Sequence, residues 1–421
     1  MRTFRDHNLA EHIAGNLRYL LKWTGIAGLM GVLIGGLGTA FYYCLSFATR
    51  MRMAHPVLIL FLPFGGLLIA LMYYLCREEH DRGTNLVITA ITSRDQIRIV
   101  KAPLIFAGTV ITHLFGGSCG REGAALQLGG CIGQNMGFVL KLDDGDRRII
   151  TMCGMSAAFA SQFGTPMAAA FMAMEISSVG VLYYASLVPC VISAFTAAGI
   201  SRALGTVPDA FTIDLIPEFT LRRALLTGLL GLLCAVVSIL FCVALHRAHD
   251  LFERFFPNLF LRIFAGGVMI TGLSFLCGLN VYNGSGIHVI EQAFETGSVP
   301  QLAFLLKILF TAITMGSGFK GGEIVPSFYV GATFGNVYAH LIHGDPDLCT
   351  AVGMAAVFCG ITNCPITSLL ICFEMFGYAG MPYFLIAISI AYTFSDYFSI
   401  FGSQKIVYSK LQNAYVNHET L

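Results

Sequence analysis

The chain has 421 residues, of which 56% are hydrophobic and only 12% are charged, and its formal net charge is +1. Soluble domains carry about 25% charged residues, so this composition excludes a soluble globular protein, and the near-zero charge argues against a nucleic-acid partner. The mean hydropathy of +0.73 indicates an integral membrane protein. We expect an all-α fold, because transmembrane β-strands would alternate polar and apolar residues.

Apolar segments follow one another along the chain and fall into two similar halves. Arg18 and Lys22 flank the first of them, which favours a cytoplasmic N-terminus. The predicted division is a cytoplasmic N-terminal segment (1–17), a first membrane repeat (18–205), a polar connection (206–223), a second membrane repeat (224–403) and a short C-terminal cytoplasmic helix (404–421).

Each half contains a glycine-rich break that carries a glutamate. Gly-Ser-Cys-Gly-Arg-Glu ends at Glu122, and Gly-Phe-Lys-Gly-Gly-Glu ends at Glu323. Such breaks at corresponding positions of two halves point to a transport site. A second match supports the duplication, since Pro166 and Pro365 each open an apolar segment that leads to a further glutamate.

The breaks have the chemistry of an anion site. Glycines directly before a helix leave its first N–H groups accessible, and the positive end of the helix dipole adds to their attraction. Two such helix ends facing each other could hold a dehydrated anion. Ionised, the Glu122 carboxylate would occupy that site itself; protonated, it would leave it, so this side chain can serve as a gate and as a proton carrier.

Other polar residues of the apolar segments have weaker claims to function. Glu175 and Glu374 are expected to satisfy backbone N–H groups between packed helices, and His113 and His340 are expected to be structural. The cysteines have no metal-ligand spacing, so neither a metal nor a cofactor is expected.

Two short motifs resemble the signatures of the CLC family of anion channels and proton-coupled antiporters. Gly-Arg-Glu-Gly at 120–123, followed by Gln127, resembles the first signature, and Gly-Gly-Glu-Ile-Val-Pro at 321–326 resembles the second. The resemblance implies an inverted repeat of two halves with broken, tilted helices, and a homodimer with one pore per subunit. It also implies that Glu122 is the gating carboxylate.

The resemblance assigns further site residues. It implies gating or proton transfer by Glu122 and Glu323, and it implies anion binding, largely by backbone amides, at Gly120, Arg121, Gly123, Ile324 and Val325. A tyrosine hydroxyl near the C-terminus closes the central site in the family, which makes Tyr408 the candidate here.

Several departures favour the fluoride-selective bacterial subclass. The internal glutamate of chloride antiporters matches Ile176, and the loop that carries Ser and Pro in chloride members matches Gly-Thr-Asn-Leu-Val, with Thr84 in place of the serine. The break that ends at Glu323 resembles the subclass, in which this glutamate and a nearby phenylalanine, here Phe328 or Tyr329, belong to the mechanism. Val325 departs from it, because the subclass usually has threonine there.

These observations predict a fluoride/proton antiporter that exports fluoride across the bacterial inner membrane as a multi-pass protein. Its partners would be a small anion (fluoride or chloride), protons, membrane lipid and a second copy of the chain. The alternative is a chloride/proton antiporter or a passive chloride channel of the same fold. An intramembrane enzyme, with Cys119 as nucleophile and His113 as base, is disfavoured, because two residues on opposite sides of a glycine break are not expected to have suitable geometry.

Overall fold

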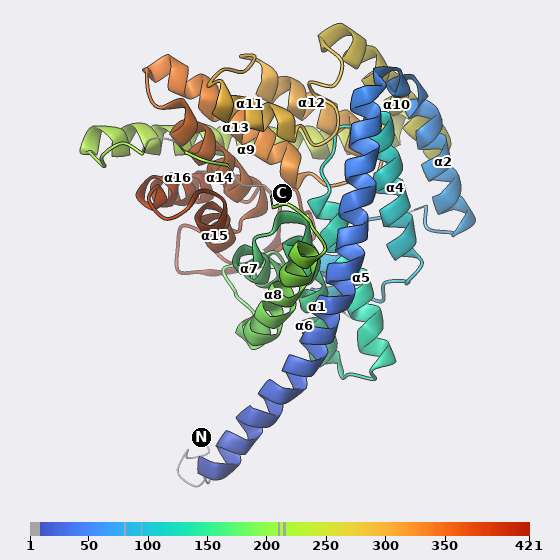
Figure 1. Cartoon of the computed structure of the whole chain (residues 1–421), viewed down its shortest axis with the longest axis vertical. Helices are drawn as coiled ribbons and strands as arrows, with labels where there is room; N and C mark the ends of the chain where they lie inside the picture. The colour runs from blue at the N-terminus through green and yellow to red at the C-terminus, as the bar shows by residue number, and fades with distance from the viewer. Residues whose placement is uncertain (1–8, 80, 94, 209–210, 214–215) are drawn as a thin grey trace.

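The computed structural model describes residues 9–79, 81–93, 95–208, 211–213 and 216–421. Helices dominate both halves of the chain (Figure 1). The first half contains α1 (Leu9–Ala54), η1 (Pro56–Phe61), α2 (Leu62–Leu75), α3 (Thr84–Thr92), α4 (Lys101–Phe115), α5 (Glu122–Val139), α6 (Asp144–Phe163), α7 (Pro166–Glu175), β1 (Ser178–Val179), η2 (Tyr184–Ser186) and α8 (Leu187–Ala203).

The second half repeats this helical order. It contains α9 (Leu221–Phe255), α10 (Leu259–Cys277), α11 (Ile287–Glu295), α12 (Ala303–Gly316), α13 (Ile324–Ile342), α14 (Pro346–Thr362), α15 (Pro365–Phe376), α16 (Met381–Phe394), β2 (Lys405–Tyr408) and β3 (Tyr415–Glu419).

Corresponding helices make corresponding contacts. α5 packs along α6 as α13 packs along α14, and α1 contacts α6 and α8 as α9 contacts α14 and α16. Matching helices of the two halves also touch each other, α2 against α10 and α7 against α15. The two halves therefore form one body with shared contacts rather than two independent domains.

Five helical segments of the described residues are long and apolar enough to cross a membrane. They are Glu11–Ala54, Pro56–Leu75, Tyr184–Ala203, Leu221–Phe255 and Leu259–Cys277. Most of the other helices are shorter than the roughly 20 residues that a full crossing needs. Short, broken helices can end inside the protein, and both glycine breaks lie at such ends.

Glu175 and Glu374 join α7 to α15 reciprocally. The carboxylate of Glu175 accepts from the backbone N–H groups of Ile366 (3.1 Å) and Thr367 (2.9 Å), at the start of α15. The carboxylate of Glu374 accepts from Met167 and Ala168, both at 2.9 Å, at the start of α7. Each glutamate therefore satisfies the free donors of the opposite helix, which confirms the structural role predicted for both.

Removing one of these caps is expected to destabilise the fold. Glu374→Ala leaves the two α7 donors without partners and should lower the free energy of unfolding by about 2 kcal/mol. Thermal unfolding of the purified protein in detergent measures this. Glu295→Ala, at an exposed position near the end of α11, is the control and should leave the midpoint unchanged. Equal midpoints for both variants would contradict the capping role.

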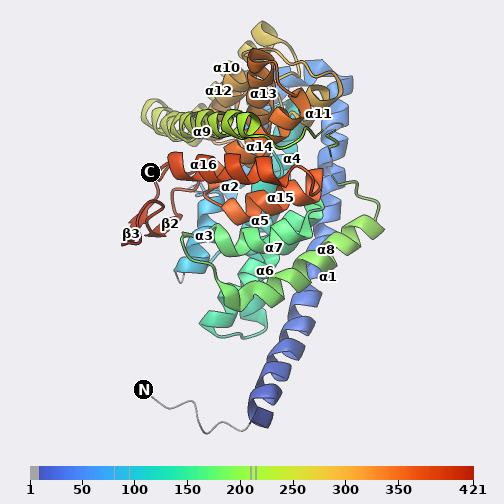
Figure 2. The same ribbon diagram turned by 90° about the vertical axis from the view of Figure 1, so that its left-hand side faces the viewer.

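The C-terminal prediction is wrong in its secondary structure. Residues 404–421 form strands β2 and β3 instead of a helix (Figure 2). β2 also pairs in parallel with β1, which follows α7. The segment pairs because Ser178 and Val179 offer it an unpaired strand edge. A further miss is α11, whose nine residues are too short and too mixed to stand out as an apolar segment.

The polar ends of the predicted division are described only in part. Residues 1–8 of the predicted N-terminal segment lie outside the described residues, and the remainder already belongs to α1. In the predicted connection, residues 209–210 and 214–215 also lie outside them. The described residues that precede α9 there have no regular secondary structure.

Candidate functional site

The two glycine breaks meet in the interior. The backbone N–H of Gly120 donates to Gly322 O at 2.7 Å, and the N–H of Gly322 donates to Gly120 O at 2.9 Å, as an antiparallel bridge. The first residues of α5 and α13 therefore lie side by side. The two breaks that resemble each other in sequence are thus adjacent in the structure.

Glycine is required where the breaks touch. A Cβ on Gly322 would lie 2.5 Å from Gly123 N, and a Cβ on Gly123 would lie 2.8 Å from the Cα of Gly322. Real Cβ atoms do not approach backbone this closely, so a side chain at either position would force the helix ends apart. The absence of side chains also leaves the first N–H groups of both helices accessible.

Glu122, the first residue of α5, is fully buried, and its carboxylate turns back onto the preceding break. Its Oε2 accepts from the backbone N–H of Arg121 at 3.0 Å, and its Oε1 accepts from the side-chain Nε of Arg121 at 3.1 Å. The Arg121 guanidinium also binds Gln162 O at 3.2 Å and lies 5.0 Å from the ring centre of Tyr42. The carboxylate thus occupies a backbone donor that the family resemblance assigns to an anion.

Glu323 has a different setting. It is the N-cap residue of α13, without a side-chain cap bond, and it lines an open cavity of about 520 Å³. Its Oε2 lies 3.4 Å from the position of a Cβ on Gly123, and the Oγ1 of Thr84 lies 3.6 Å from the same point. Gln127 donates to Thr84 Oγ1 at 3.1 Å. Thr84 and Gly123 therefore lie close to Glu323, which lines the cavity together with Gln127.

The first turn of α13 completes the described site. Ile324 and Val325 are buried, and Val325 Cβ lies 3.0 Å from the position of a Cβ on Gly120. Phe328 packs edge-on to Phe163, with ring centres 5.6 Å apart. The valine therefore presents a methyl surface to the break where the fluoride subclass has a hydroxyl.

Tyr329 faces the other way along α13. Its ring lies 5.1 Å from Lys307 Nζ, and its hydroxyl reaches Val281 O at 3.5 Å. Of the two aromatic candidates, Phe328 lies nearer the first break, because Phe163 adjoins Gln162, which binds Arg121. Tyr329 packs against the loop between α10 and α11.

The structure contradicts the assignment of Tyr408 to the central site. Its side chain is 45% exposed on β2, and its ring packs edge-on against Tyr415 at 5.9 Å. Strand pairing with β1 and β3 turns this side chain to the surface. Gln404 and Ile406 of this segment are buried instead, and Gln404 donates to Ile176 O at 2.9 Å and to Thr362 O at 2.8 Å.

A charge network that the sequence did not reveal holds the second break at the cavity. Asp81 accepts from Lys320 of the break at 2.9 Å and from Lys101 of α4 at 3.1 Å. Lys101 also pairs with Glu78 at 2.9 Å. Burial alone would raise the pKa of Asp81, but Lys320 and Lys101 lower it to about 2. A lysine inside a glycine break was the one sign in the sequence of such a network. Its partner Asp81 lies too far from Lys320 along the chain to be identified from the sequence.

This network predicts a pH-dependent stability difference. The lowered pKa means that the contribution of Asp81 is fully present above pH 4 and is lost as the pH falls through about 2. Asp81→Asn should therefore cost about 2 kcal/mol of unfolding free energy near neutral pH and progressively less toward pH 3. Thermal unfolding across this range measures it, with the exposed Asp95→Asn as control. A cost that does not change with pH would contradict the ion pairing.

Cys119 and His113 are in contact, although the glycine break lies between them in the sequence. The Sγ of Cys119 lies 3.7 Å from His113 Nδ1. That nitrogen also lies 3.0 Å from the backbone oxygen of Thr109, so the proton on Nδ1 is directed to a carbonyl, and the nitrogen cannot then accept one from the thiol. The contact therefore does not form a nucleophile with a general base.

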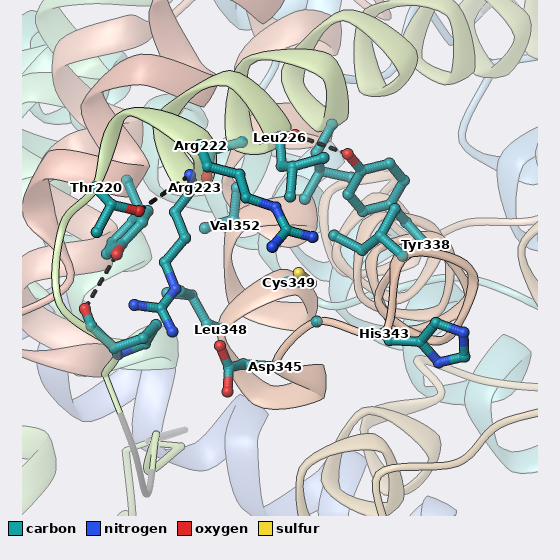
Figure 3. A pocket seen from close by; sticks show the side chains of 16 residues that line it. Thr220, Arg222, Arg223, Leu226, Tyr338, His343, Asp345, Leu348, Cys349 and Val352 are labelled. Atoms are coloured by element: carbon teal, nitrogen blue, oxygen red, sulfur yellow. Dashed lines mark hydrogen bonds between the residues drawn. The ribbon is translucent and has the colours of Figure 1, made fainter.

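A second cavity, of about 260 Å³, lies at the start of α9 (Figure 3). The side chains of Arg222 and Arg223 extend from the first turn of α9, with Asp345 and His343 on the opposite wall. Its lining includes no residue of either glycine break. It carries charges of both signs and lacks the accessible backbone donors of the breaks, so it is not the predicted anion site.

Comparisons with known proteins agree with this fold. A "Chloride/fluoride channel protein" of Pseudomonas syringae pv. tomato is 36% identical over 94% of this chain and 88% of its own. The crystal structure of a CLC-type fluoride/proton antiporter matches with a TM-score of 0.88 and 32% identity, over 95% of this chain and 99% of that one.

More distant structures share the fold. The crystal structure of a slow cyanobacterial Cl⁻/H⁺ antiporter has a TM-score of 0.76 at 21% identity, over 89% of this chain and 94% of that one. Residues 65–396 match the sequence pattern of the voltage gated chloride channel family. The chain is therefore a multi-pass membrane protein with the CLC fold and belongs to the voltage gated chloride channel family.

Proposed function

We propose that the chain is a fluoride/proton antiporter that exports fluoride by using the proton gradient. The observation that carries this proposal is the position of the Glu122 carboxylate on the backbone N–H of Arg121. A fluoride ion needs the same donor, so carboxylate and anion compete for one place. Protonation of Glu122 weakens its hold and frees the donor, which couples the arrival of a proton to the binding of an anion.

Glu323 supplies the second carboxylate of the cycle. It lines the open cavity, whereas Glu122 is fully buried. Protons and anions from one aqueous side can therefore reach Glu323 first, beside Thr84 and Gly123. Ile176, which matches the internal glutamate of chloride antiporters, is buried and apolar and cannot carry a proton. Glu323 is thus the better candidate for proton exchange at the cavity.

The same reading assigns the backbone N–H groups of Arg121, Gly123, Ile324 and Val325 to the anion. Fluoride is small and strongly hydrated, so it requires several close donors to replace its water shell. Two helix N-termini that meet directly provide such donors without a bound metal. We further propose a homodimer in the bacterial inner membrane, with the transport path inside each subunit.

The alternative is a chloride/proton antiporter or a passive channel of the same fold. The name of the Pseudomonas relative, which includes both anions and the word channel, keeps this alternative relevant. Thr84 and Val325 would explain it. Thr84 stands where chloride members carry serine, and Val325 stands where the fluoride subclass usually carries threonine.

Ion-selective electrodes distinguish these anions. The purified protein in liposomes, loaded in parallel with fluoride or chloride, is expected to release fluoride at least about 100-fold faster than chloride. Empty liposomes and the Glu122→Gln variant are the controls. Equal rates, or faster chloride release, would overturn the fluoride assignment and favour the alternative.

A further inference from the structure

Two basic side chains lie buried near the first break, with no carboxylate partner among the described residues. Arg52, near the end of α1, is 2% exposed, and Lys307 of α12 is fully buried. The ion pairs between described residues include neither of them. By contrast, Lys101 and Lys320 both pair with Asp81. An unpaired buried cation is costly in a membrane protein and is rarely retained without a function.

Both cations converge on one residue, Gly284. Lys307 Nζ donates to Gly284 O at 2.7 Å and to Tyr282 O at 3.1 Å. On the other side, a Cβ on Gly284 would lie 2.5 Å from Arg52 Nη1, so the guanidinium packs against the glycine itself. Two like charges thus flank a single residue. Carbonyl oxygens satisfy hydrogen bonds of both side chains but do not cancel their charge.

Arg52 binds the end of α4 directly, whereas Lys307 reaches it only through the loop that carries Gly284. Arg52 Nη1 donates to His113 O at 3.2 Å, in the last turn of α4. The loop that carries Gly284 binds the next carbonyls, since its own N–H donates to Gly117 O at 3.0 Å. The neighbouring Asn283 donates to Gly116 O at 2.8 Å. Arg52 Nε is buried and has no hydrogen-bond partner.

The position of these contacts has an electrostatic consequence for the site. The carbonyl end of α4 carries the negative pole of its dipole and faces the same break that presents the positive end of α5. Left alone, the end of α4 would repel an anion held at the start of α5. Arg52, bound to His113 O, counters this repulsion directly, and Lys307 adds a basic group on the loop that binds Gly116 O and Gly117 O. A carboxylate paired with Arg52 or Lys307 would cancel their attraction for an anion, which explains why neither has one among the described residues.

We propose that Arg52 and Lys307 set the anion affinity of the transport site without contacting the anion. Arg52 binds the carbonyl end of α4, and Lys307 holds the Gly284 loop that also binds it. The negative charge in the breaks, either the ionised Glu122 or the transported anion, is their counter-charge. The proposal rests on the proposed anion transport at the breaks. Neither Arg52 nor Lys307 belongs to a signature motif of the family.

Neutral substitutions test the proposal in liposomes. Lys307→Met and Arg52→Gln are each expected to raise the apparent KM for fluoride release at least about tenfold, with a smaller change in the maximal rate. The matched control is Lys410→Met. Lys410 is also largely buried and also binds main-chain oxygens, those of Tyr392 and Asp396 at the end of α16, but it touches neither break. Its KM should stay within twofold of the parent value.

The outcomes separate this proposal from the proposed function. KM values within twofold of the parent for Lys307→Met and Arg52→Gln would overturn it. If Lys307→Met does not purify as a folded protein, Arg52→Gln decides the question, and Lys307→Arg, which keeps the charge, should retain the parent KM. If the parent carries chloride instead of fluoride, the proposed function fails. A raised KM for chloride in the same variants would then still support the role of the cations.

Discussion

Glu122→Gln is expected to abolish proton movement while the protein remains folded. The amide has almost the shape of the carboxylate and can still accept from Arg121 N, but it cannot take up or release a proton. It also lacks the negative charge that competes with an anion for that donor. We expect fluoride-driven proton uptake to fall at least about 100-fold, because the acid–base group is lost entirely.

The size of the remaining anion flux distinguishes the two kinds of transport. In an antiporter the variant loses coupled exchange, whereas in a passive channel the variant only changes its gating and continues to conduct. Parallel electrode records of fluoride and pH from the same liposomes measure both fluxes. Glu295→Gln, at an exposed position, is the control. Proton uptake in Glu122→Gln equal to that of the parent would contradict the assigned role of the carboxylate.

Gly322→Ala is expected to have the second largest effect. Its methyl group would lie 2.5 Å from Gly123 N, so the two helix ends must separate, and the bridge between Gly120 and Gly322 must lengthen. A displacement of about 1 Å at a reacting site can cost about 100-fold in rate. We expect a comparable loss of anion flux, since the backbone donors would no longer converge on one ion.

A glycine elsewhere supplies the matched control. Gly272 lies within α10, and no atom lies within 4 Å of the position of its Cβ. Gly272→Ala should therefore leave flux unchanged and raise helix stability slightly, because alanine favours helices more than glycine does. Flux in Gly322→Ala within twofold of the parent would show that the close approach of the breaks is not required.

Much of the site could be predicted because its chemistry is local. Glycine before a helix start and a glutamate inside an apolar chain are visible without a structure, and the repeated pattern implied that the two breaks meet. The caps by Glu175 and Glu374 were predictable for a similar reason. A proline that opens each helix marks the free donors, and each carboxylate repeats at the same offset.

The remainder depends on contacts between distant segments. Tyr408 was misplaced because strand pairing with β1, far away in the chain, decides which side chains of β2 are buried. The contact of Cys119 with His113 was missed because the turn at Gly116, with a φ of +91°, reverses the chain within a few residues. Arg52 and Lys307 lie in apolar helices with no motif around them, and only the fold brings both to Gly284.

The central claim is that one carboxylate exchanges a proton for a fluoride ion. The most direct test places the purified protein in liposomes with an outward fluoride gradient and no proton gradient, and records internal pH. The account predicts that fluoride leaving the liposome drives protons inward against a growing gradient, and that Glu122→Gln abolishes this uptake. A proton ionophore should dissipate the resulting pH difference. Fluoride release with no change of internal pH would contradict proton-coupled exchange.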